Sequence, residues 1–263
     1  MPDPELATHV RRYNGYLESS SRAVRRRELP SGEVALIISL GPHYQLIDPL
    51  TGGLLSTLRT FVAGLDDSYS VVDSGIAGAA IQVDFTPIGA HQVLQVPMHL
   101  VSKRTVELSD LFGSEADRLV EQLCEAPDWH SRFVTLDHFL LSKIRKSGKP
   151  VSEVEWAWRQ LELSHGATSI RGITERLGWT RKRLIKVFRD EIGIPPKLLA
   201  RILRFRRALA ECSSGKVISL SQLAAECGYS DQSHMIRDFK AFSGWTPYEL
   251  IGFYSPDAGF IES

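Results

Sequence analysis

Polar side chains with hydrogen-bonding capacity are concentrated at the start of one short helical segment near the C-terminus. The segment CGYSDQSHMIRDFKAFSGWTPYEL runs from Cys227 to Leu250, and its pattern predicts two helical pieces joined at Gly228-Tyr229. The polar residues at the front of the second piece are Ser230, Gln232, Ser233, His234 and Arg237. They offer hydroxyl, amide, imidazole and guanidinium groups. We therefore interpret them as groups that bind a polar partner outside the chain.

The same arrangement occurs twice, fifty residues apart. The first copy reads SIRGITERLGWTRKRLIKVF and the second reads SLSQLAAECGYSDQSHMIRDF. Each copy predicts a short helix, a glycine–aromatic pair, a helix N-cap and a second helix that closes on an aromatic core residue. The paired positions are Gly178-Trp179 with Gly228-Tyr229, Thr180 with Ser230, and Phe188 with Phe239. Because glycine permits the left-handed turn through which short helices cross, the repeat predicts two helix-turn-helix motifs.

In such a motif the second helix enters the major groove of DNA with its N-terminal side chains against the base edges. We predict recognition helices over residues 180–190 and 230–242. The predicted base-contacting residues are Lys182, Ile185 and Lys186 in the first copy and Ser233, His234 and Arg237 in the second. The predicted DNA-binding set also includes Thr180, Arg181, Ser230 and Gln232. For Ile185 two interpretations stay open, contact with a thymine methyl group or burial in the core.

The segment IPPKLLARILRFRRALAEC separates the two motifs and predicts a helix of about sixteen residues, roughly 24 Å long. A rigid spacer of this kind helps to place two recognition helices in successive major grooves, about 34 Å apart. Of its arginines we expect Arg207 to pair within the domain and some of the others to be solvated. Residues 152–254 carry 16 Lys/Arg against 11 Asp/Glu, although the whole chain is neutral. This local positive charge favours DNA as a partner.

Both motifs and the spacer resemble the tandem helix-turn-helix domain of the AraC/XylS-type bacterial transcription regulators. The resemblance covers about residues 152–254. It is most specific at Gly228-Tyr229-Ser230, Gln232-Ser233, Phe239-Lys240, Gly244 and Thr246-Pro247. It implies a regulator that binds double-stranded promoter or operator DNA. The lysines of the first recognition helix depart from the family pattern, so the target sequence stays open.

The resemblance also implies roles for the rest of the chain, because the remainder of such regulators usually senses a ligand or mediates dimerisation. RNA polymerase, a small-molecule effector and a second copy of the chain are therefore candidate partners. It implies no enzymatic activity and no cofactor. The chain has no apolar run of about 20 residues and no secretory signal at its start, so we expect a cytoplasmic protein without a membrane partner.

The expected fold class is α+β, in which an N-terminal small β-barrel of cupin-like type with two helices precedes an all-α domain. Short Val/Ile/Leu-rich runs predict strands, which we place at 32–40, 44–50, 54–64, 69–75, 79–85 and 91–96. Helical spacing returns in SEADRLVEQLCEA and SRFVTLDHFLLSKI. We predict a regulatory or dimerisation domain at 1–144, a linker at 145–152 and the DNA-binding domain at 153–254.

Several alternatives stay open for the N-terminal part. Arginines alternate in SRAVRRRELP, with Arg22, Val24 and Arg26 on one face, and form either an anion site or a solvated edge strand. The two helices either pack on the barrel or form a dimer interface. An enzyme with a DNA-binding appendage would need converging acid/base or metal groups, but the sequence lacks HxH, HxxxH, GxSxG and GxxxxGK[ST]. We expect no metal site. A DNA-binding protein with little sequence choice is the second alternative.

Overall fold

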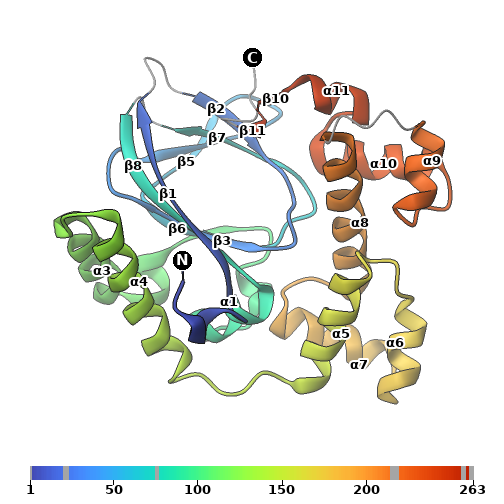
Figure 1. Ribbon diagram of the computed structural model, residues 1–263, viewed down its shortest axis with the longest axis horizontal. Coiled ribbons are helices and arrows are strands. Elements are labelled where there is room, and N and C mark those ends of the chain that lie inside the picture. The colour runs from blue at the N-terminus through green and yellow to red at the C-terminus, as the bar shows by residue number, and fades with distance from the viewer. Residues whose placement is uncertain (1, 20–23, 75–76, 214–218, 256–258, 261–263) are drawn as a thin grey trace.

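The computed structural model describes residues 2–19, 24–74, 77–213, 219–255 and 259–260. A β-rich N-terminal part lies beside an all-helical C-terminal part (Figure 1), which confirms the expected α+β class. Among these residues, no helix combines the length and apolar character that crossing a bilayer requires.

The N-terminal strands form two antiparallel sheets that face each other without closing into a barrel. The five-stranded sheet has the order β1 (Val10–Ser19), β8 (Ala77–Phe85), β3 (Val34–Ser39), β6 (Thr60–Ala63) and β9 (Thr105–Glu107). The four-stranded sheet has the order β2 (Val24–Glu28), β7 (Ser70–Ser74), β4 (Tyr44–Ile47) and β5 (Leu54–Leu58). The cupin-like expectation is confirmed in its layering, and the barrel is open.

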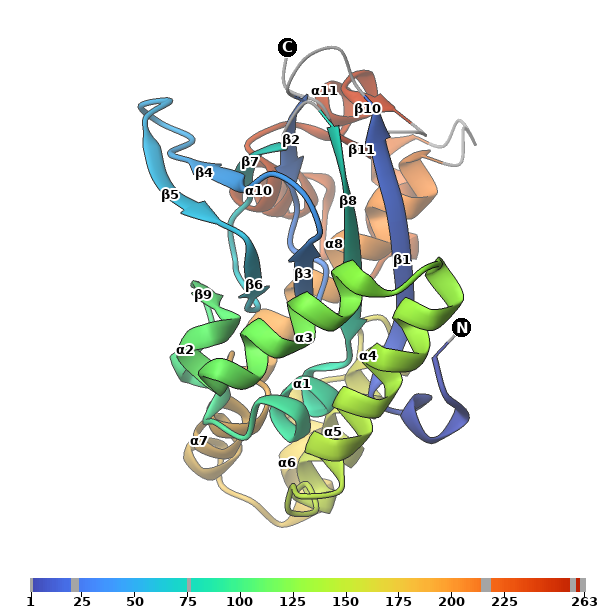
Figure 2. The same cartoon turned by 90° about the vertical axis from the view of Figure 1, so that its left-hand side faces the viewer.

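Side-chain alternation gives the five-stranded sheet two different faces. In β3, Val34, Leu36 and Ile38 are buried in the main core, whereas Ala35 and Ile37 point to the space between the sheets. Helices cover the core face (Figure 2): α1 (Pro87–Leu94), α2 (Leu108–Phe112), α3 (Ser114–Glu125) and α4 (Trp129–Ile144). The apolar stripes predicted for α3 and α4 pack into this core.

Two predictions for this region are wrong. The apolar run at 91–96 lies largely in α1 and not in a strand, because Thr86 accepts a hydrogen bond from the Gly89 amide (2.9 Å) and Pro87 stands at the first helical position. Strand β1 was not predicted at all. It pairs along its length with β8 and carries Arg11, Arg12 and Tyr13. These polar residues give no strand pattern in the sequence, and the strand forms because it pairs with β8.

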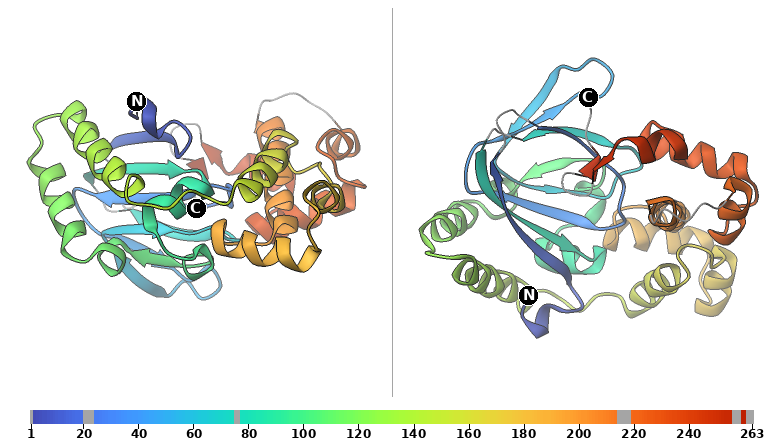
Figure 3. Two further views of the ribbon diagram at one scale, coloured as in Figure 1. Left: turned by 90° about the horizontal axis from the view of Figure 1, so that it is seen from below. Right: turned by 45° about the horizontal axis from the view of Figure 1, so that its top comes forward.

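The C-terminal helices are α5 (Ser152–Leu163), α6 (Ile170–Leu177), α7 (Arg181–Glu191), α8 (Pro196–Ser213), α9 (Leu220–Glu226), α10 (Gln232–Ser243) and α11 (Pro247–Gly252). Helix α8 has 18 residues and runs through this part, with α5, α6 and α7 at one end and α9, α10 and α11 at the other (Figures 1 and 3). A small hairpin of β10 (Tyr254–Ser255) and β11 (Gly259–Phe260) follows, and β11 contacts β2.

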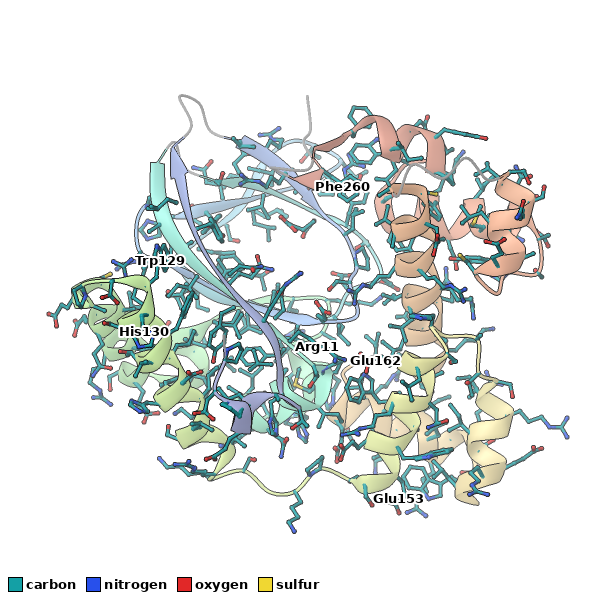
Figure 4. All side chains as sticks on the ribbon, viewed as in Figure 1. Arg11, Trp129, His130, Glu153, Glu162 and Phe260 are labelled. Atoms are coloured by element: carbon teal, nitrogen blue, oxygen red, sulfur yellow. The ribbon has the colours of Figure 1, made fainter. Side chains whose placement is uncertain are left out.

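The two parts of the chain share one continuous core, since buried residues from Leu6 to Leu250 form a single cluster. Polar contacts reinforce the junction. Arg11 of β1 pairs with Glu162 of α5 (Figure 4), and Arg206 of α8 pairs with Glu33 at 3.2 Å. Residues 145–151, which connect α4 to α5, contain no helix or strand. The predicted division into domains stays a prediction.

Candidate nucleic-acid interface and internal cavity

The first helix-turn-helix motif consists of α6 and α7. Gly178 ends α6 in the left-handed conformation (φ +64°), and Thr180 caps α7 by accepting a hydrogen bond from the Arg183 amide at 3.2 Å. Leu184 and Phe188 are buried and fix the inner face of α7. The outer face therefore carries the predicted DNA-binding residues of this copy.

Those outer residues are available to a partner. Thr180, Arg181, Lys182 and Lys186 are all exposed. Ile185 is half-buried, and it does not pack against the core cluster of the described residues. The core interpretation of Ile185 therefore loses its support, and a contact outside the chain remains.

The second motif, α9 and α10, has a one-residue insertion at the helix start. Gly228 takes the left-handed turn (φ +75°), but the N-cap is Asp231, whose side chain accepts a hydrogen bond from the His234 amide at 2.7 Å. The prediction of Ser230 as N-cap is wrong. Ser230 instead donates a hydrogen bond to Asp231 at 3.1 Å, and α10 begins at Gln232. The charged carboxylate of an aspartate therefore accepts the capping hydrogen bond in place of a hydroxyl group.

The insertion changes which residues are equivalent in the two copies. Caps and buried residues of the second helices are fifty-one residues apart, as Leu184 and Met235 show. In this register Ser233 is equivalent to Lys182, Ile236 to Ile185 and Arg237 to Lys186. Ile236 is half-buried and was missed from sequence, because the apparent fifty-residue repeat hid its equivalence to Ile185.

His234 is equivalent to Arg183, and both pack against the aromatic residue of their own hinge. The Arg183 guanidinium lies 4.3 Å from the centre of the Trp179 ring, and His234 meets Tyr229 edge-on at 5.3 Å. His234 also lies 3.1 Å from the Ser230 hydroxyl through its Nδ1. It therefore supports the turn, while Ser233 and Arg237 are exposed in the first two turns of α10.

The remaining predicted residues of the second copy are held by local hydrogen bonds. Gln232 accepts a hydrogen bond from Ser221 of α9 at 3.2 Å, which ties the two helices of the motif together. Arg237 Nε donates to the Ser233 carbonyl oxygen at 3.2 Å, along its own helix. The structure thus places Gln232, Ser233, His234 and Arg237 in the first two turns of α10, with Ser230 just before its N-cap.

Arginines of α8 fix both motifs to the spacer helix. Arg201 pairs with the buried Asp238 of α10 at 2.7 Å, and Arg204 donates to the Gly166 carbonyl oxygen at 2.8 Å. Phe205 packs against Phe239 of α10, with ring centres 4.9 Å apart. Arg201 and Arg204 make these contacts, and the expectation that Arg207 pairs within the domain stays a prediction. Helix α8 therefore contacts both recognition helices, α7 and α10.

Comparisons with known proteins agree with this geometry. Residues 173–251 match the family model of a helix-turn-helix domain, and residues 1–107 match a domain of unknown function (DUF6597). Residues 173–251 are a helix-turn-helix domain of the AraC type. Among curated proteins, none matches the sequence of this chain.

Solved structures of ToxT from Vibrio cholerae are similar to this chain in fold. Unsaturated-fatty-acid-bound ToxT from strain SCE256 is 13% identical, with a TM-score of 0.50 over 93% of this chain and 95% of that chain. ToxT from strain O395 is 14% identical, with a TM-score of 0.48 over 94% and 98% of the two chains. At this identity the likeness concerns the fold.

A cavity of about 880 Å³ lies between the two sheets of the N-terminal part. Its apolar walls include Leu17, Val24, Ile37, Leu46, Phe61 and Val72, and Tyr16 and Tyr44 join their hydroxyl groups across it at 2.8 Å. Charged residues also reach it, notably Arg26 and Glu28 of β2. Among the described residues, no group of three or more His, Cys, Asp or Glu side chains is placed to hold a metal ion.

The arginine-rich strand β2 is not a simple solvated edge, because the side chains on one face line the cavity and those on the other face contact other residues. Val24, Arg26 and Glu28 line the cavity, as the predicted alternation requires; Arg22 and Ala23 lie outside the described residues. On the opposite face, Arg25 makes two 2.8 Å hydrogen bonds to Asp73. The Arg27 guanidinium lies between the rings of Tyr69 (3.9 Å) and Trp245 (3.6 Å). Arg27 also donates to the Ser243 carbonyl oxygen at 2.5 Å, at the end of α10.

Proposed function

We propose that this chain is a transcription regulator that recognises a specific operator by inserting α7 and α10 into two successive major grooves, and that a ligand in the N-terminal cavity modulates this binding. Base contacts come from Lys182, Ile185 and Lys186 of α7 and from Ser233, Ile236 and Arg237 of α10. Thr180, Arg181, Ser230 and Gln232 lie at the edge of the groove, near the phosphates, and His234 positions the turn.

One observation carries the DNA part of the proposal. Two helices of the same construction present equivalent exposed polar positions at their N-termini, and α8 contacts both of them. Exposed lysine and arginine side chains can hydrogen-bond to guanine, and half-exposed isoleucines can pack on thymine methyl groups. The local surplus of positive charge adds the salt-dependent attraction to phosphates.

The effector part rests on the cavity and on strand β2. Arg26 and Glu28 face the cavity, while Arg27 between them holds the end of α10. A ligand that shifts β2 therefore changes the support of the second recognition helix. Binding of an unsaturated fatty acid by ToxT, which shares the fold, supports a small-molecule effector.

In vitro selection of duplex DNA by the purified full chain tests the readout. We expect a motif of two blocks centred about one helical turn apart. Arg237→Ala should lose preference at one base step within one block and should bind the selected duplex about 1–3 kcal/mol more weakly. Arg171→Ala, which removes an exposed cation of α6, is the matched control and should retain the full motif.

Selection without any motif, with affinity that fades evenly as salt rises, would support the competing function of a DNA-binding protein with little sequence choice. An equal loss for Arg237→Ala on every duplex would point the same way. If a motif appears only when a small molecule is present, DNA recognition is specific and a ligand in the cavity controls it.

A further inference from the structure

The cavity contains a carboxyl group without a partner. Glu28 ends strand β2, on the same face as Arg26, and lines the cavity. It is the exposed residue of this strand, and yet burial is the largest of the causes that raise the pKa of its carboxyl group. Glu28 therefore has accessible surface and forms part of the cavity wall.

The carboxyl group of Glu28 makes no hydrogen bond or ion pair with any residue in the described part of the chain. Arg26 attracts its charge from a distance, and Asp84 repels it. A carboxylate that lines a cavity and lacks an ion pair can pair with a cation that enters the cavity, because an opposite charge stabilises its charged form. The carboxyl group of Glu28 is therefore available to a ligand.

The other charged groups around the cavity are already engaged. Asp84 accepts hydrogen bonds from Arg12 (2.5 Å) and Gln82 (2.7 Å), and Glu33 pairs with Arg206. Asp66 accepts from the Asp67 and Ser68 amides, and Arg26 donates to Ser74 at 2.8 Å. The wall carries four acidic residues and two arginines, so its formal charge is negative. This charge disfavours an anionic ligand and favours a cation.

We propose that the cavity binds an apolar molecule that carries a positively charged amino group, and that the amino group pairs with Glu28. This inference rests on the proposed effector role of the cavity and specifies its ligand class. The apolar body would lie against Val24, Leu46 and Val72, next to the Tyr16–Tyr44 pair. Such a ligand is opposite in charge to a fatty acid.

The pairing predicts a dependence on pH. An ammonium group beside Glu28 lowers the pKa of the carboxyl group that burial had raised, so binding expels a proton wherever the empty cavity holds Glu28 protonated. Affinity for the amine therefore rises with pH and levels off above the pKa of Glu28 in the empty cavity. An alkylammonium stays charged over this range, since its own pKa is close to the value of about 10.4 for lysine.

The test uses three probes with one skeleton: 3-phenylpropan-1-amine, 3-phenylpropan-1-ol and 3-phenylpropanoate. Calorimetric titration of the full chain without DNA should show the amine binding about tenfold or more tightly than either relative. Glu28→Gln should lower the amine affinity by about the same factor and leave the alcohol nearly unchanged. The exposed Glu175 of α6 provides the control, because Glu175→Gln should leave all three affinities unchanged.

Tighter binding of the carboxylate than of the amine would overturn the proposal, and so would amine binding that is unaffected by Glu28→Gln. The proposal would also be overturned if the amine did not bind at all over the range from pH 5 to pH 8. Glu28→Gln removes a desolvated charge, so we expect the variant to fold; the pH dependence of the unaltered protein provides a second readout in any case. Because DNA is absent, failure here leaves the proposed operator readout to be judged by its own selection experiment.

Discussion

Single residues determine how each recognition helix begins. In the second motif Asp231 performs the capping that a hydroxyl performs in the first, and its carboxylate meets the amide of His234 at the positive end of α10. This hydrogen bond is the first cause that lowers the pKa of Asp231. Arg237 and Ser233 follow within two turns, so the cap also sets the orientation of the groups proposed to read bases.

Replacement of Asp231 by alanine should lower the urea midpoint of unfolding at neutral pH, because an amide at the start of α10 loses its acceptor. Asp231→Asn, which retains an acceptor without charge, should lose less. Since the folded-state pKa of Asp231 is depressed, its contribution is present above the unfolded value of about 3.9 and is lost as pH falls through the folded value. The midpoint difference between wild type and Asp231→Asn should therefore disappear in strong acid. A difference that persists there would contradict the electrostatic part of this role.

At the scale of elements, β2 joins the cavity to the second motif. Its alternating side chains face two directions, so Arg27 contacts the end of α10 while its neighbours line the cavity. Trp245, which covers Arg27, stacks in turn on Phe253 with ring centres 4.5 Å apart. We define Arg27, Tyr69 and Trp245 as the clamp. A strand that contributes to both sites transmits a shift from one to the other.

Gly244 allows the clamp to close, and its replacement should open it. This residue ends α10 with φ +78°, and a Cβ there would lie 2.7 Å from Arg27 Nη1 and 2.9 Å from Tyr69. Gly178 ends α6 with φ +64° in open space. Gly178→Ala should therefore cost roughly 1–2 kcal/mol of unfolding free energy from backbone strain alone. Gly244→Ala should cost roughly 1–3 kcal/mol more from overpacking.

A double-mutant cycle isolates the clamp. If the contact with Arg27 causes the extra loss, Arg27→Ala should relieve part of the Gly244→Ala penalty and none of the Gly178→Ala penalty. Hydrogen exchange should then show faster opening of 232–243 in Gly244→Ala than in Gly178→Ala. If the two glycine variants lose equal unfolding free energy, the clamp does not contribute to the effect of Gly244→Ala.

Sequence patterns predicted the elements whose signal is local. The stripes of α3 and α4 and the two helix-turn-helix motifs follow from apolar spacing and glycine hinges. Strand β1 and helix α1 escaped, because pairing with β8 outweighs the polar character of β1 and because Thr86 and Pro87 start a helix in a Val-rich run. The extra residue before Asp231 also escaped, since both Ser230 and Asp231 are good caps and only the backbone distinguishes them.

At the scale of the whole molecule, contacts between the two parts had no signature in the sequence. Arg11 with Glu162, Arg206 with Glu33, and His99 with Asp190 at 3.2 Å join residues that lie far apart in the chain. No single-sequence periodicity links such pairs. The sequence also could not predict that the Glu28 carboxyl group lacks a partner. That depends on how the folded sheets pair the nearby charged residues Arg12, Arg26 and Asp84 with other side chains.

These contacts predict how the molecule unfolds. Gly32 lies against the apolar side chains of α8, where a Cβ would be 3.5 Å from Leu203, and Gly193 after α7 lies against the Met98 carbonyl and Ser102. An interface that is continuous with both cores couples their stabilities, whereas a small polar interface would leave two independent domains.

We therefore expect one calorimetric transition for the full chain, with equal calorimetric and van't Hoff enthalpies. The separate segment 153–254 should melt at a lower temperature, because Leu199, Ile202 and Leu203, which lie beside Gly32 of the N-terminal part, become more exposed to water. Arg206→Ala should lower the single transition without splitting it, since its 3.2 Å ion pair with Glu33 is one contact among many. Two separate transitions in the full chain would show that the cores fold independently. The cavity could then influence α10 only through the clamp.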